Sequence, residues 1–437
     1  MSTFDDGYPS RGANGWRGSR WPRWQSALLL RPTCTFGPAS AHSICSTSPF
    51  LDPVRGSTVH PAGRRRSGHM VQISRYQLIL ILMWTVLGTG IVTMPATIAQ
   101  FTLRDSWIAG FGLLLGAVIC AVVALVHVRL FPGRTLTQAA TDVLGPAFGR
   151  VYGIWYLVYG FVTIATIGRE MGAFIGISAL PTTPEYLITA VAFAVSMYLS
   201  YLGIEVVARV NEFIFPLAIV VGPILFGLAA RLFDSSSFQP FFGDPAAAAW
   251  RAAVVPAFAY GLEFAIALQW VPALRTPRTL PWDIVIAGAI SAFVLSALVT
   301  LTVGVLGEPA RYLNYPVLEL VRAIRQGKFF ERLDTMYVMG VAVTLVLKLT
   351  AFQLAIGEAV KDVSGSPERT WIPVPVALLG WSLSNYLFRN VFDVTNFILR
   401  DVPSYFLATV VLLPGAIYAL RAVQTVRAKN QRGLRST

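Results

Sequence analysis

The sequence has 437 residues, of which 55% are hydrophobic and only 13% charged, and its formal net charge is +13. Its mean hydropathy is +0.60. Soluble domains carry about 25% charged residues, so this composition excludes a protein whose whole surface faces water and predicts a membrane protein. The length leaves room for roughly ten to twelve spanning helices and excludes a large additional soluble domain.

The positive charge is divided between a polar leader and the flanks of apolar segments. Residues 1–69 contain nine Arg and three Asp, a net charge of +6, and the remainder lies beside the apolar segments. Arginine at such flanks orients a membrane protein, and no basic stripe is interleaved with aromatic residues, so we expect no nucleic-acid binding.

Motifs for enzyme chemistry are missing from the sequence. Cys34, Cys45 and Cys120 have neither disulfide nor metal-ligand spacing, and the phosphate-loop, dinucleotide-binding and zinc-protease patterns do not occur. We therefore expect no metal site, no cofactor and no enzyme activity.

The first 69 residues are rich in Ser, Arg, Gly and Pro. We interpret residues 1–69 as a disordered leader, or as a segment upstream of the true start of translation at Met70. The polar sequence that follows Met70 leads directly into the first apolar segment.

Windowed hydropathy predicts a ten-helix membrane domain over residues 70–421 and a basic tail at 422–437. The ten predicted spans are 76–99, 107–131, 151–179, 185–203, 212–232, 252–273, 283–306, 335–360, 371–388 and 404–421.

Arginines indicate the orientation of these spans. With ten alternating spans, Arg75, Arg134, Arg275 and Arg427 fall on one side, which the positive-inside rule assigns to the cytoplasm together with both termini. The segment Tyr315 to Asp334 also carries basic residues but falls on the opposite side. Its helical apolar period predicts a structured external element, which serves either as a lid or as a docking surface.

Two predicted spans contain helix-breaking residues. The first has Gly88-Thr89-Gly90 followed by Pro95, and the sixth has Pro256 followed by Tyr260-Gly261. Spans one and six correspond to each other in two five-span halves, and paired broken helices in such positions indicate a transporter-type site near the bilayer midplane. Free N–H groups of a half-helix would then bind a carboxylate. The alternative is that Gly and Pro are simply common in membrane helices.

Ionisable residues within spans also require an explanation because they are costly in a bilayer. Glu263 lies beside the predicted break, where it would bind an amine or exchange a proton. Lys348 lies in the middle of span eight, where its ammonium would replace a coupling sodium ion or pair with Glu263. The alternative is an ion pair that only joins two helices. We expect Arg169 and Glu170, near the external end of span three, to reach the membrane interface.

Seven segments resemble the B-type subunit of spore germinant receptors, the GerAB-like germination permeases of the amino acid-polyamine-organocation superfamily. They are ISRYQL, LGTGIVTMP, FPGRTL, GREMGAFI, GIEVVARVNEFIFP, YPVLELVRAI and GKFFERLDTMYV. The resemblance extends from Ile73 to about Leu420, and the last two segments are its most specific part.

The resemblance implies an all-α, LeuT-like amino-acid permease fold of two inverted five-helix repeats. It places a small germinant, typically an amino acid, between spans one, three, six and eight. Gly88, Thr89 and Gly90 would bind its carboxylate, and Phe258, Tyr260 and Gly261 would form the opposing wall.

The resemblance also implies partners and a location. Such a chain would assemble with an A-type membrane subunit and a C-type lipoprotein in the inner spore membrane, and germinant binding would start germination. A proton-coupled secondary amino-acid transporter is the alternative function, and a scaffold without a ligand is a third one, which the broken helices disfavour.

Overall fold

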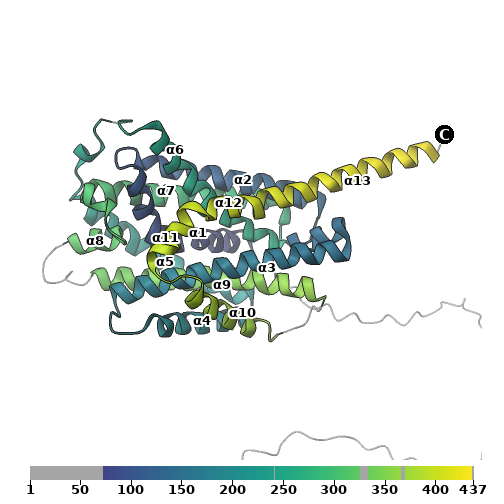
Figure 1. Cartoon of the computed structure of the whole chain (residues 1–437), viewed down its shortest axis with the longest axis horizontal. Helices are drawn as coiled ribbons and strands as arrows, with labels where there is room; N and C mark the ends of the chain where they lie inside the picture. The colour runs from purple at the N-terminus through teal and green to yellow at the C-terminus, as the bar shows by residue number, and fades with distance from the viewer. Residues whose placement is uncertain (1–71, 241, 325–332, 366–369, 436–437) are drawn as a thin grey trace, which may run out of the picture. The chain divides into compact units, whose positions relative to one another are not determined.

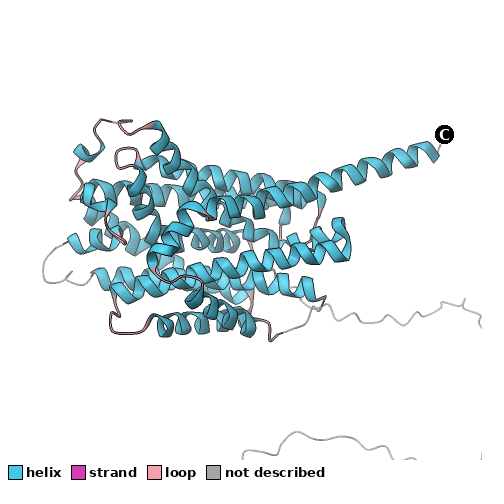
Figure 2. Ribbon diagram, viewed as in Figure 1, coloured by secondary structure: helices cyan, strands magenta, loops and turns pink. Residues whose placement is uncertain are grey.

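The structure is a computed structural model of the chain, and it describes residues 72–240, 242–324, 333–365 and 370–435. Helices joined by loops make up these residues, without a strand among them (Figure 2). The predicted all-α membrane fold is therefore confirmed. The predicted leader and Met70 lie outside the described residues.

The α-helices, in chain order, are α1 Arg75–Phe101, α2 Ala109–Leu130, α3 Leu136–Ser178, α4 Glu185–Leu202, α5 Ile204–Ala230, α6 Ala246–Val255, α7 Leu280–Leu306, α8 Pro316–Ala323, α9 Leu333–Ser364, α10 Pro373–Tyr386, α11 Val391–Arg400, α12 Val402–Phe406 and α13 Leu413–Arg435 (Figure 1). Shorter 3₁₀ segments are η1 Ser106–Ile108, η2 Ser235–Phe238, η4 Gly261–Ala273, η5 Pro277–Thr279 and η6 Glu308–Arg311, and π segments are η3 Pro256–Tyr260 and η8 Leu407–Leu412.

Within the described residues, 9 helical segments are long and apolar enough to cross a membrane. They coincide with nine of the ten predicted spans. The remaining predicted span, 371–388, contains α10, which has 14 residues. At 1.5 Å per residue, α10 rises about 21 Å, which is less than the roughly 30 Å of a hydrocarbon core.

Local sequence explains where the helices begin and bend. Ser74 and Gln77 form a reciprocal capping box at the start of α1, and Thr135 and Gln138 form another at the start of α3. Gly145 interrupts α3 with a φ of 82°, just before Pro146, and so divides a short first segment from the membrane span.

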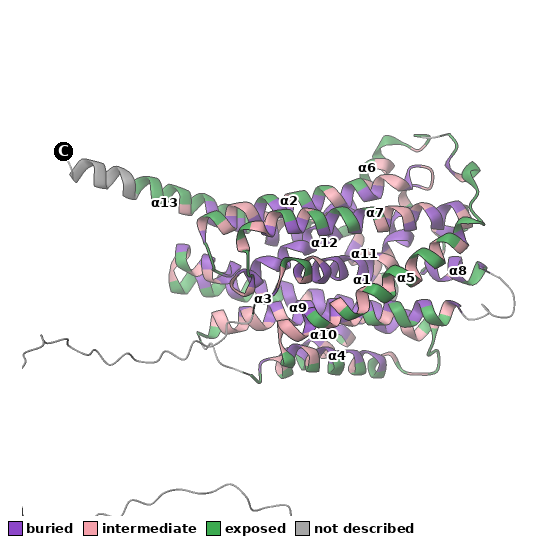
Figure 3. Ribbon diagram, turned by 180° about the vertical axis from the view of Figure 1, so that it is seen from behind, coloured by how far each residue is buried: buried purple, intermediate pink, exposed green. Residues whose placement is uncertain are grey.

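Two segments occupy the middle of the bundle. In the most apolar part of both α1 and residues 246–273, 83% of the residues are buried, whereas in α5 only 6% are buried (Figure 3). Helix α2 packs against α7, and α3 packs against α9, around this centre. The helix-breaking residues of both segments therefore lie inside protein and not against lipid.

The ends of several spans are joined at one face of the bundle. Arg75 pairs with the buried Asp283 at 2.7 Å, and the backbone N–H of Ile73 donates to the carbonyl of Ala273 at 2.9 Å. Asp362 of α9 accepts hydrogen bonds from Gln138 at 2.7 Å and Gln269 at 3.2 Å. These contacts join the start of α1, the start of α3, the end of α9 and the end of residues 261–273.

Candidate ligand-binding site

A buried ion pair lies at the centre of the bundle. The ammonium of Lys348 on α9 donates to both carboxylate oxygens of Glu263 at 2.7 Å and to the hydroxyl of Thr89 on α1 at 2.6 Å. The three residues are 1%, 5% and 3% exposed, respectively. All three ammonium hydrogens are therefore used. The pair joins α1, α9 and the residues from Ala246 to Ala273, which are called the sixth segment below.

An inner pocket of about 380 Å³, partly open to solvent, adjoins this ion pair. Its lining residues come from α1, α3, the sixth segment, α9 and the segment from α11 to α12: Thr89, Val162, Thr163, Thr166, Ile167, Glu170, Ala259, Tyr260, Glu263, Lys348, Phe397, Ile398, Val402 and Phe406.

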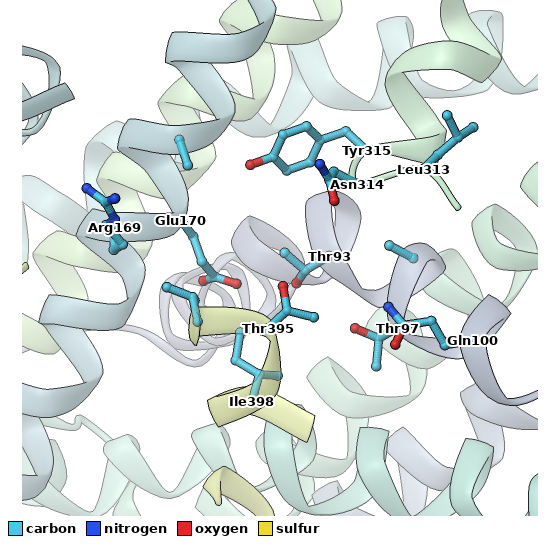
Figure 4. A pocket seen from close by; sticks show the side chains of 13 residues that line it. Thr93, Thr97, Gln100, Arg169, Glu170, Leu313, Asn314, Tyr315, Thr395 and Ile398 are labelled. Carbon is cyan, nitrogen blue, oxygen red and sulfur yellow. The ribbon is translucent and has the colours of Figure 1, made fainter. Parts of the chain in front are cut away.

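A second, outer pocket of about 540 Å³ lies next to the inner one and is more polar (Figure 4). Its lining residues are Thr93, Ala96, Thr97, Gln100, Arg169, Glu170, Ala173, Leu313, Asn314, Tyr315, Val394, Thr395 and Ile398. Glu170 and Ile398 line both pockets. The hydroxyls of Thr93 and Tyr260 are hydrogen bonded at 2.8 Å, so this pair links the wall of one pocket to the wall of the other.

The external segment contributes to the outer pocket. Leu313, Asn314 and Tyr315 precede α8 and line the pocket, and the ring of Tyr315 lies edge-on to Phe174 of α3 with centroids 5.1 Å apart. Burial raises the pKa of Tyr315 above its ordinary value, so its hydroxyl stays protonated at neutral pH. Only part of the predicted Tyr315 to Asp334 element is visible, because residues 325–332 lie outside the described residues.

The sixth segment is interrupted as the sequence predicts. Helix α6 ends at Val255, a π turn covers Pro256–Tyr260, and a 3₁₀ helix continues from Gly261. Pro256 has no N–H for the α-helical ladder, and Gly261 allows close approach to Gly116 of α2. The change of helix type at this point places Ala259, Tyr260 and Glu263 along the inner pocket.

A family model described as spore germination protein matches residues 72–385. This chain belongs to the spore germination protein family. Two relatives are from Bacillus subtilis strain 168. Spore germination protein B2 is 23% identical over 275 residues, 62% of this chain and 73% of the relative. Spore germination protein KB is 22% identical over 344 residues, 76% of this chain and 90% of the relative.

Solved structures of transporters share the fold. MhsT in complex with L-phenylalanine has a TM-score of 0.57 and 18% identity, over 81% of this chain and 90% of that chain. Mhp1, a nucleobase-cation-symport-1 family transporter with bromovinylhydantoin bound, has a TM-score of 0.59 and 11% identity, over 80% and 78%. The likeness confirms the expected LeuT-like fold for this member of the spore germination protein family.

The predicted break in the first span is wrong. Helix α1 continues from Arg75 to Phe101 through Gly88, Thr89 and Gly90. A Cβ at Gly88 would lie 3.1 Å from the carbonyl oxygen of Thr344, and one at Gly90 would lie 2.7 Å from the side chain of Leu295. These glycines permit close helix packing, and the backbone between them stays helical because unmet hydrogen bonds are costly in this environment.

The structure separates the predicted ligand residues into two groups. Thr89, Tyr260, Glu263 and Lys348 line the inner pocket. The others lie in helix contacts: Gly88 faces α9, Gly90 faces α7, Gly261 faces α2, and Phe258 is half-buried against the core. Ligand contacts by any of these residues stay a prediction.

Sequence reasoning underestimated Glu170. It is 7% exposed and lines both pockets, so it does not extend to the membrane interface as expected. Its neighbour Arg169 points elsewhere, to Glu185 at 2.6 Å. The spacing of polar residues in the sequence could have predicted this position. Thr163, Thr166 and Glu170 recur every three or four residues and so lie along one face of α3.

Two glycines of α2 make close helix contacts that were not predicted from the sequence. Gly112 and Gly116 form a GxxxG pattern, and a Cβ at either would lie about 2 Å from a backbone oxygen of the sixth segment, at 1.9 and 2.1 Å. This pattern is a known signal of close helix packing in membranes.

Among the described residues, no group of three His, Cys, Asp or Glu side chains is placed to hold a metal ion.

Proposed function

We propose that this chain is the integral-membrane subunit of a spore germinant receptor that binds a small germinant, an amino acid, in the inner pocket. The observation that carries the proposal is the pocket beside Lys348, Glu263 and Thr89, on a transporter fold in a spore germination protein. The transporter MhsT, which shares the fold, was solved with L-phenylalanine, and this supports an amino acid as the ligand class.

The ion pair favours a sensor that does not couple to sodium. Lys348 holds a fixed positive charge among α1, the sixth segment and α9. A second cation at the same place would be repelled by several kcal/mol at the effective dielectric of a protein interior. Binding can still change the balance between two arrangements of these helices, and partner subunits would detect that change.

We further propose that the partners are an A-type membrane subunit and a C-type lipoprotein in the inner spore membrane, with both termini in the cytoplasm. The positive-inside rule supports this orientation through Arg75, Arg134 and Arg275.

Proton-coupled amino-acid transport is the second candidate. Two buried carboxylates, Glu170 and Glu263, lie along adjoining pockets, and such an arrangement is typical of proton-coupled transporters. The engagement of Glu263 by Lys348 weighs against a free exchange of its proton.

Binding and uptake of each labelled amino acid by the full chain in proteoliposomes, with and without a proton gradient, separates these functions. We expect saturable binding without accumulation. Thr166→Phe, which fills the inner pocket, weakens the binding at least about tenfold, whereas Val220→Phe on the exposed face of α5 leaves it intact. Accumulation that collapses with the gradient would establish the transporter instead.

A further inference from the structure

We propose that the outer pocket is itself a binding site for a small organic molecule bearing an ammonium group, and that the carboxylate of Glu170 binds this ammonium. The inference rests on the proposed function, and it adds the chemical group that is recognised and a second place where recognition occurs.

Glu170 is buried and has no ion-pair partner among the described residues. Its side chain is 7% exposed, and its Oε1 atom has no hydrogen-bond partner within the part of the chain that the structure describes. In Figure 4 the carboxylate points into the outer pocket, toward Thr93. An unpaired carboxylate in a low-dielectric site costs several kcal/mol, so a positively charged ligand at this place is favoured.

The cationic side chains around the pockets already have acidic partners. Arg169 pairs with Glu185 at 2.6 Å and donates to the carbonyl of Arg389 at 3.0 Å. Lys348 uses its hydrogens on Glu263 and Thr89. Glu170 is therefore the buried acidic group beside the pockets that pairs with neither of these two cations.

The other groups around the outer pocket match an ammonium. An ammonium has three N–H donors, and Glu170 accepts one or two of them. Hydroxyl and amide oxygens of Thr93, Thr97 and Asn314 line the same pocket and can accept the rest.

Glu170 also lies where the two pockets meet. It lines both, and the hydrogen bond between Thr93 and Tyr260 lies beside it. The same carboxylate can therefore hold the ammonium while the rest of the molecule occupies the outer pocket and later the inner one. In the inner pocket the charges of Lys348 and Glu263 already satisfy each other.

Ligand chemistry is tested first, with the purified full chain in lipid nanodiscs. The probes are the twenty amino acids, each beside its decarboxylated amine and its deaminated acid, with affinity measured by calorimetry. We expect every deaminated acid to bind at least about tenfold more weakly than the parent amino acid, because a charge-assisted hydrogen bond is lost. Equal affinities would overturn the inference.

The role of Glu170 is tested by substitution. Glu170→Gln weakens binding of the tightest probe at least about tenfold, Glu170→Asp retains part of it, and Glu205→Gln, a matched change in an exposed ion pair of α5, has no effect. Unchanged affinity in a folded Glu170→Gln variant overturns the inference. Competition by sodium chloride, but not by choline chloride, overturns it also, because the site then binds an alkali ion.

The outer site is separated from the inner one by filling either pocket. Thr163 lines the inner pocket, and Thr97 lines the outer one. We expect Thr163→Phe to retain residual binding. Adding either Glu170→Gln or Thr97→Phe to this variant should remove that residual binding. Complete loss of binding in both Thr163→Phe and Thr166→Phe, at an unchanged melting temperature, overturns the outer site. Failure of every probe to bind the wild-type chain would overturn the proposed function too, whereas the other contrary outcomes overturn this inference alone.

Discussion

At the residue scale, the central feature is a set of charges that compensate one another. Lys348 contacts Glu263 and Thr89 within 2.7 Å, and the pair is almost fully buried. Burying two charges is unfavourable, and their attraction offsets this cost only when their hydrogen bonds are complete. The pair therefore joins three spans only while both members remain.

The ion pair of Lys348 and Glu263 leads to a prediction about the free energy of unfolding. Lys348→Met leaves the Glu263 carboxylate buried without a partner, and we expect a loss of about 3–5 kcal/mol in the free energy of unfolding. The double variant Lys348→Met with Glu263→Gln should be more stable than Lys348→Met alone, because neither position then carries a charge. Denaturation of the three proteins in detergent, followed by tryptophan fluorescence, measures both effects. A double variant no more stable than Lys348→Met would show that the pair does not act as a unit.

At the element scale, the first and sixth segments both contain glycine and proline, but only the sixth changes its helix type. Helix α1 contains Gly88, Gly90 and Pro95 and remains helical, whereas the sixth segment changes from α to π to 3₁₀ at Pro256. The glycines of α1 face side chains and backbone of α7 and α9, which pack closely against an intact helix. The sixth segment instead packs its irregular backbone against glycines of α2.

This packing makes a prediction for α2. In Gly116→Ala the new methyl group would lie 2.1 Å from the carbonyl oxygen of Ala257, and backbone atoms cannot yield as a flexible side chain can. We expect a destabilisation of about 1–3 kcal/mol. Gly222→Ala on α5 is the matched control, because a Cβ there meets nothing within 4 Å, and a helical Gly→Ala change stabilises slightly. Equal melting temperatures for the two variants would contradict the assigned contact.

At the scale of the whole molecule, the number of crossings depends on α10. Nine segments of the described residues meet the length of a span, and α10 has 14 residues. Helix α10 packs against α3, α4 and α9. With α10 as a crossing there are ten spans, and both termini share one side of the membrane.

Labelling from one side of the membrane tests this arrangement. We expect Ser364→Cys, at the end of α9, and Arg389→Cys, just after α10, to react with an impermeant maleimide from opposite sides. The background replaces Cys34, Cys45 and Cys120 with Ser. Labelling of both positions from the same side would mean that α10 does not cross.

The sequence by itself determined the fold class, the positions of the spans, the family and the interruption at Pro256. The fold class, the spans and the interruption follow from the hydropathy of consecutive residues and from the missing N–H of proline, which are local properties. The family follows from the resemblance of seven sequence segments. An ion pair between Glu263 and Lys348 was one of the alternatives that the sequence left open, because charges within spans are costly unless they are compensated.

Only the tertiary structure decided which side chains share a pocket. Gly88 and Gly90 lie in close helix contacts. Glu170 was expected at the membrane interface, but it lies where the two pockets meet. Those outcomes depend on which helix lies opposite each residue. The contact partners are distant in sequence, so no local pattern of hydropathy or helix propensity contains that information.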